Sequence, residues 1–159
     1  MTRRCQSPKS TAPQREKSRQ RKGRGSILLS MKLMTNLAGI ILGLIFNVVA
    51  FNFFFHFFAM PEPPTGSPPA LFLGAMISTG YFNVVKVLEI TGGLCVIFPR
   101  TRPLGLLLLG PVVVNILCFH IFLMKGEGIF PLPTLVALLS LFLLWRNRSA
   151  FASLLSRGR

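Results

Sequence analysis

Acidic residues and polar surface are both scarce in this sequence. Only 4 acidic residues stand against 18 Lys and Arg, and 51% of the 159 residues are hydrophobic. A soluble domain needs polar residues along its whole length to cover its surface, whereas here they collect near the two ends. The stretch from Leu33 to Ala59 carries no charge and is longer than the roughly 20 apolar residues that cross a bilayer. This composition predicts an integral membrane protein.

The side-chain sets of common catalysts and metal sites are missing too. The cysteines, Cys5, Cys95 and Cys118, form no C-x-x-C pair and have no zinc-ligand spacing. No Ser–His–acid or Cys–His set is discernible, and no Gly-rich phosphate loop is present. We therefore predict free thiols, with Cys95 and Cys118 as small apolar fillers. Catalysis is left undecided, and a role without catalytic activity of its own is favoured.

The basic charge is concentrated rather than spread over a folded surface. Nine of the 18 Lys and Arg precede Ser26, and all the others except Lys86 lie at the ends of apolar runs. This distribution does not indicate a nucleic-acid partner. Residues 1–30 form a basic tail with few large apolar groups, and we expect this tail to be disordered. Because Met31 precedes an apolar run, translation from Met1 and translation from Met31 both stay open.

Four apolar segments predict an all-α integral membrane protein, a four-helix bundle over residues 31–148. Their connectors are short, so consecutive helices are expected to pack as antiparallel neighbours. A short basic C-terminal tail, residues 149–159, follows the bundle. The expected helices cover about residues 32–59, 70–98, 103–124 and 129–145.

Lysine and arginine orient the predicted bundle, because the cytoplasmic flanks of membrane helices collect these residues. Sixteen of the 18 lie in the N-terminal flank, the second connector and the C-terminal tail, and only Lys125 lies in the outer connectors. Without residues 1–30 the split is still seven against one. We therefore predict that both termini lie on the cytoplasmic side.

A small set of polar residues falls inside the apolar segments. Lys86 and Glu89 are three apart on one helix face, and Glu89 lies about 14 Å from the expected cytoplasmic helix end at Phe98. The amide side chains expected to reach the same polar centre are those of Asn115, Asn83 and Asn52. The set is either a lock that neutralises its charges and joins helices, or a site that binds a polar head group or relays a proton. The residues alone leave both interpretations open.

Two histidines lie near the outer ends of their predicted helices. His56 is three residues before the end of the first helix, and His120 is four residues before the end of the third. Facing one axis, they would suit a quinone carbonyl, whereas taken singly each would bond backbone or water at the interface. A metal site needs more ligands than two histidines, so we predict none.

A series of motifs follows in order along the chain from about Met31 to Arg148. They are His56-Phe57 with Met60-Pro61 and Pro63-Pro64, then Thr79-Gly80-Tyr81, Lys86, Glu89, Gly92-Gly93, and Pro111 through Val114-Asn115 to Phe119-His120. In this order and spacing the chain resembles the DoxX family of membrane proteins. The resemblance implies a four-helix fold in a bacterial cytoplasmic (inner) membrane, and a link to quinone-dependent redox or thiol-stress complexes.

Three hypotheses for function follow, and in all of them the lipid bilayer is a partner. The first is an accessory subunit of quinone-linked redox chemistry, which would bind another membrane or redox protein and have a quinone as its candidate cofactor. The second is a small proton-coupled transporter module, which would need to form a homodimer because four helices are few for a transporter. The third is a purely structural partner protein whose basic tail binds anionic lipid. The sequence names neither a substrate nor an oligomeric state.

Overall fold

In a computed structural model, the residues that the structure describes, 12–126 and 131–156, form helices joined by loops and turns. Side chains are described over 29–126 and 131–152. The chain divides into two units, Met1–Met34 and Thr35–Arg159. Two described helical stretches are long and apolar enough to cross a membrane, Leu29–Phe55 and Arg102–Leu123, and a third qualifies if a bent pair of helices counts as one. The expected all-helical class is confirmed for these residues, whereas the four-span topology stays a prediction.

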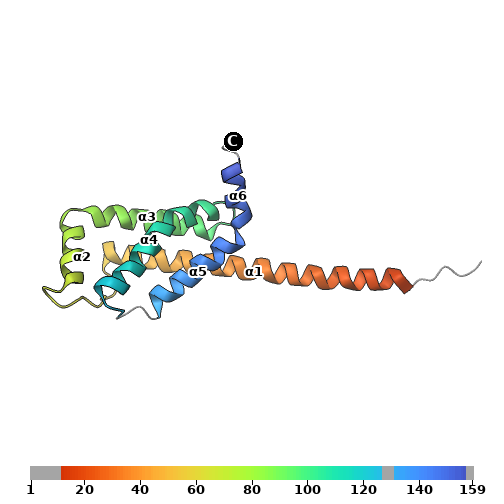
Figure 1. Ribbon diagram of the computed structural model, residues 1–159, viewed down its shortest axis with the longest axis horizontal. Coiled ribbons are helices and arrows are strands. Elements are labelled where there is room, and N and C mark those ends of the chain that lie inside the picture. Colours follow the sequence, from red (N-terminus) through yellow and green to blue (C-terminus); the bar gives the residue numbers. More distant parts are fainter. Residues whose placement is uncertain (1–11, 127–130, 157–159) are drawn as a thin grey trace, which may run out of the picture. The chain divides into compact units, whose positions relative to one another are not determined.

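Helix α1 (Ala12–Phe55) begins well before the first apolar segment (Figure 1). The sequence predicted disorder over residues 1–30, and this is wrong from Ala12 onward; residues 1–11 lie outside the described part of the chain. The segment is rich in Arg, Lys and Gln, which are good helix formers. A helix that the apolar segment has already nucleated gains one hydrogen bond for each further residue, so it can propagate into such a segment.

The second apolar segment is bent, and the prediction of one helix over residues 70–98 is therefore wrong. It forms α2 (Pro68–Ser78) and α3 (Tyr81–Ile97), which meet at an angle of 85° (Figure 1). Gly80 adopts a φ of 73° at the break, a left-handed conformation that glycine accepts without steric cost. The hydroxyl of Thr79 donates to the carbonyl of Ala75 at 2.8 Å and so closes the last turn of α2.

The rest of the bundle is formed by α4 (Arg102–Cys118), a π-helical turn η1 (Phe119–Leu123), α5 (Leu132–Arg146) and α6 (Arg148–Ser156). Helix α3 packs on α4, and α4 packs on α5. The expected start of the last apolar helix near residue 129 lies outside the described residues. Helix α5 has 15 residues and is shorter than the two stretches that are long enough to cross a membrane.

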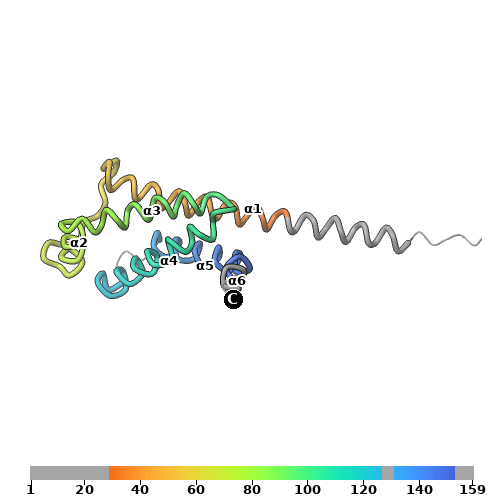
Figure 2. Tube along the Cα trace, turned by 90° about the horizontal axis from the view of Figure 1, so that it is seen from above, coloured from red at the N-terminus to blue at the C-terminus, as the bar shows by residue number. Residues whose placement is uncertain are grey.

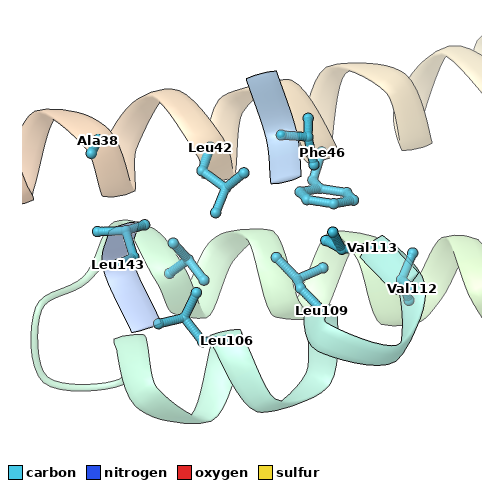
Figure 3. Close-up of a cluster of buried hydrophobic side chains, with 10 residues drawn as sticks. Ala38, Leu42, Phe46, Leu106, Leu109, Val112, Val113 and Leu143 are labelled. Atoms are coloured by element: carbon cyan, nitrogen blue, oxygen red, sulfur yellow. The ribbon is translucent and has the colours of Figure 1, made fainter. Parts of the chain in front are cut away.

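The apolar core lies among α1, α3, α4 and α5 (Figure 3). On α1 it uses Ala38, Leu42 and Phe46, which are four residues apart and so form one stripe along the helix. Figure 3 shows Leu42 and Phe46 pointing toward Leu106 and Leu109 of α4. Many other large apolar side chains face outward on every one of these helices, so the bundle has an apolar exterior as well as an apolar core.

Glycines set the spacing between the helices. A Cβ added to Gly43 of α1 would lie 2.6 Å from the carbonyl oxygen of Gly93 on α3, and one added to Gly105 of α4 would lie 2.7 Å from that of Gly92. Gly92 and Gly93 therefore serve two different neighbours, α4 and α1, and α3 runs beside the apolar half of α1 (Figure 2). A pair of small residues on α3 thus allows two neighbouring backbones to approach closely.

Candidate functional site

The centre of the candidate site is an ion pair on α3. The ammonium of Lys86 donates to Oε2 of Glu89 at 2.8 Å, and both side chains are buried, 9% and 4% exposed. The two residues are one helical turn apart, so the helix itself holds the pair together without help from another element. The expectation that they share one face is confirmed, and the choice between a structural lock and a binding site stays open.

Aromatic rings cover the pair on one side. The ammonium of Lys86 lies 4.8 Å from the centre of the Phe82 ring, which is the spacing of a cation–π contact. Phe53 of α1 packs edge-on against Phe82 with ring centres 5.1 Å apart. Phe82 was not predicted from the sequence, although its position four residues before Lys86 places the two side chains on one face of the helix.

Two of the predicted amides are exposed and take no part in the centre. Asn115 and Asn83 both face outward, and within the described residues neither side chain has a hydrogen-bond partner. Asn115 follows the buried Val113 by two residues, which places it about 200° further round α4. Asn83 precedes Glu89 by six residues, so it lies about 120° away from that carboxylate around α3. The prediction used only the depth of these residues along their helices, and depth does not determine which face of a helix a side chain occupies.

The remaining predicted amide, Asn52, is buried and is used for a different purpose. Its side-chain nitrogen donates to the carbonyl of Phe58 at 3.0 Å, and its side-chain oxygen accepts from the amide of Phe58 at 2.8 Å. Asn52 thus fastens the chain that leaves α1 rather than contacting Lys86. Asn47 is buried as well, and its side chain donates to the carbonyl of Gly43 within α1 at 2.7 Å.

The two predicted histidines are held by different local structures. His56 is exposed, directly follows α1 and has a φ of 53°, the left-handed conformation that often ends a helix. His120 lies within η1 and is half-buried, and its Nδ1 is 2.8 Å from the carbonyl of Ile116. For His120 the structure favours the interpretation in which the ring bonds the backbone. No group of three or more His, Cys, Asp and Glu able to hold a metal occurs among the described residues.

Arg102 was counted in the sequence only as a flanking charge, but the structure buries it. Its side chain and backbone together are 3% exposed. Its Nε donates to the carbonyl of Val96 at 3.0 Å, and its two terminal nitrogens both reach Oδ1 of Asn36 at 3.3 Å. The missed signal was Gly39, one turn after Asn36, because only a residue without a side chain leaves room for a guanidinium there.

Comparisons with known proteins assign no function to this arrangement. No protein-family model matches the chain, and no curated protein or solved structure matches it. The resemblance to the DoxX family therefore rests on the motifs quoted above, and what it implies is carried forward as a proposal.

Proposed function

We propose that this chain is a DoxX-like integral membrane protein of a bacterial cytoplasmic membrane that acts as an accessory subunit of quinone-linked redox chemistry, without catalytic activity of its own. Its four apolar segments and the asymmetry of its Lys and Arg support four crossings with both termini cytoplasmic. Helices α3 and α5 have 17 and 15 residues, or about 26 and 22 Å of helix, which is short for a bilayer core of about 30 Å. Flanking residues or local thinning of the bilayer complete these crossings.

The observation that carries the subunit role is the exposure of Asn115. It lies about 18 Å along the helix from Pro103, inside a stretch long and apolar enough to span a membrane. An amide that faces hydrocarbon without a hydrogen bond is costly, and such amides join helices to one another. The described part of the chain supplies Asn115 with no such bond. A helix of another membrane protein is the partner that satisfies it.

The quinone part of the proposal rests on the chemistry of Lys86 and Glu89. A quinone head group has carbonyl oxygens that accept hydrogen bonds, and its reduced form has hydroxyls that donate them. The Lys86 ammonium has three N–H donors and gives one to Glu89, and the carboxylate of Glu89 is an acceptor. The rings of Phe82 and Phe53, packed edge to face, supply apolar surface beside these groups. In this role Lys86 and Glu89 orient the head group, and the electron transfer belongs to the partner.

Two measurements on protein purified in mild detergent test the two parts separately. For the partner, Asn115→Leu should release co-purifying membrane protein. The control Val114→Leu, at the preceding residue, which is also exposed, should retain it. For the quinone, solvent extraction should recover quinone from the wild type but at least several-fold less from the double variant Lys86→Met, Glu89→Gln. The matched control is Lys125→Met with Glu62→Gln, which removes the same two charges at exposed positions in the outer connectors.

The outcomes separate the interpretations. Equal quinone in the double variant and in the control would leave Lys86 and Glu89 as a structural lock. Equal recovery of partner from Asn115→Leu and Val114→Leu would remove the argument for an accessory subunit.

A second function is favoured by one feature, the sharp break between α2 and α3. Broken membrane helices commonly line the substrate sites of transporters, and this pair bends by 85° within an apolar stretch. A proton-coupled transporter module would use Lys86 and Glu89 as its relay and would need a second copy of the chain. Uptake into proteoliposomes that depends on Glu89, together with a dimer in native mass spectrometry, would establish it over the accessory role.

A further inference from the structure

The end of the bundle where α3 gives way to α4 contains a buried arginine. Arg102 is held from two sides, because its Nε donates to the carbonyl of Val96 and its guanidinium lies over Gly39 of α1. A Cβ added to Gly39 would lie 2.8 to 3.0 Å from three atoms of the guanidinium. The position of this cation is therefore set by the packing of α1, α3 and α4, and it is not a freely moving surface arginine.

The charge of Arg102 is not neutralised within the described part of the chain. The ion pair found there is Lys86–Glu89, which lies within α3 and involves neither end of α4. The acceptors of Arg102 are a backbone carbonyl and a side-chain amide, and both are neutral. A buried cation that keeps only neutral acceptors carries a large desolvation penalty, which a nearby anion relieves.

Asn36 occupies the place where an anion would be expected. Both terminal nitrogens of Arg102 point at its single Oδ1 atom, and both distances are 3.3 Å. These are longer than the 2.7–2.9 Å of a charge-assisted hydrogen bond from guanidinium to an oxyanion. Asn36 is itself exposed, so its side chain has room to turn away. If an oxyanion replaced Asn36, the same guanidinium N–H groups would donate to a negatively charged acceptor instead of a neutral one.

A second arginine reaches the neighbouring residue of α1. Arg146, the last residue of α5, donates through Nε to the hydroxyl of Thr35 at 3.3 Å, and its side chain is exposed. Two guanidinium groups from different helices are thus anchored on Thr35 and Asn36, which are consecutive. Neither guanidinium has a carboxylate partner among the described residues, so both would attract an anion that binds at this level of α1.

We propose that Arg102 and Arg146, with Thr35 and Asn36, bind the phosphate group of an anionic ligand at this end of the bundle. A phosphate has enough oxygens to accept from two guanidinium groups at once, which a single carboxylate does less well. Two sources share this chemistry, the head group of an anionic phospholipid and a free phosphate compound. Basic sites between membrane helices commonly take lipid head groups on the cytoplasmic side. The proposal does not depend on the quinone site, because the two sites share no residue.

The test measures thermal unfolding of the delipidated full chain in a neutral detergent. Phosphatidylglycerol, phosphatidylcholine and inorganic phosphate are titrated in separate arms. Stabilisation by phosphatidylglycerol alone identifies a lipid head group, and stabilisation by inorganic phosphate identifies a free phosphate compound; both outcomes support the site. Equal stabilisation by phosphatidylcholine, or none by any of the three, overturns it.

Three variants locate the effect. Asn36→Asp places a carboxylate against Arg102, so the ligand-free protein should gain stability and its response to the anionic ligand should fall about tenfold or more. Arg146→Gln should weaken the response by a similar factor. Arg148→Gln removes the same charge at an exposed position two residues later and should leave the response unchanged. A wild-type response in both Asn36→Asp and Arg146→Gln, or equal losses in Arg146→Gln and Arg148→Gln, contradicts the proposal.

Discussion

The close approach of α3 and α4 at Gly105 can be tested by adding a single methyl group. A Cβ at this position would lie 2.7 Å from three atoms, the carbonyl oxygen of Gly92 and the amide nitrogen and Cγ2 of Val96. Two of these are backbone atoms, so no side-chain rotation can make room for the methyl group. The Gly105→Ala variant therefore has to push the two helices apart.

The magnitude follows from the distances. Ordinary contacts of a Cβ begin at 3.4 Å, so the backbones must separate by about 0.7 Å to accept the methyl group. Overpacking of this kind costs about 1–3 kcal/mol. Replacing glycine by alanine in a helix also gains up to about 1 kcal/mol from propensity alone. The useful quantity is therefore the difference between Gly105→Ala and a glycine on the same helix where the added Cβ meets nothing.

Gly110 of α4 provides that control, because no atom lies within 4 Å of a Cβ built there. Gly92→Ala is an intermediate case, since its added Cβ meets mainly the side chain of Leu109, at 2.8 Å. We expect the free energy of unfolding to fall in the order Gly110→Ala, Gly92→Ala, Gly105→Ala, with about 1–3 kcal/mol between the first and the last. Unfolding in mixed micelles of a mild detergent and SDS, followed by circular dichroism, measures it. Equal stability of Gly105→Ala and Gly110→Ala would refute the packing described for α3 and α4.

Two further predictions concern polar residues. Glu89→Gln alone leaves the Lys86 ammonium buried without its partner and should lower the free energy of unfolding by about 3–5 kcal/mol, whereas the double variant Lys86→Met, Glu89→Gln should lower it much less. The same unfolding measurement compares the two variants. Similar losses in both would show that the pair is not isolated from other charges. His56→Gly should stabilise the protein by about 1 kcal/mol, because glycine accepts the φ of 53° that strains a larger residue. A loss of stability in His56→Gly would instead show that the imidazole makes a contact of its own.

The sequence predicted helices well where a long apolar run defined them, and poorly where a turn interrupted such a run. Long apolar runs between Pro-rich connectors located α1 and α4 within a few residues of their apolar ends, because few structures other than helices bury the backbone of such runs. The break at Gly80 was missed, although Thr79-Gly80 has the composition of a helix C-cap. The apolar run continues across this break. Hydrophobicity indicates that a segment lies in apolar surroundings, but it does not show whether the backbone changes direction there.

For the site, sequence separation predicted contacts within one helix but not contacts between helices. Lys86 and Glu89 are three apart, and their bond depends on helix geometry alone. Asn115 was assigned to the same centre by depth, but whether it faces inward depends on how α4 is rotated, which is set by Gly105 and its neighbours. Arg102 shows the opposite error. It reads as an ordinary flanking charge, and only the crossing of α1 at Gly39 buries it.

Among the residues whose side chains the structure describes, two buried cations, Lys86 and Arg102, have partners of different kinds. Lys86 has a carboxylate 2.8 Å away on its own helix, so its charge is neutralised as soon as α3 forms. Arg102 receives only neutral oxygens from the described residues, and those come from α1 and α3 after the helices have packed. If the proposed anion binds at Arg102, its removal should therefore loosen the packing of α1 against α4 and leave the Lys86–Glu89 pair intact.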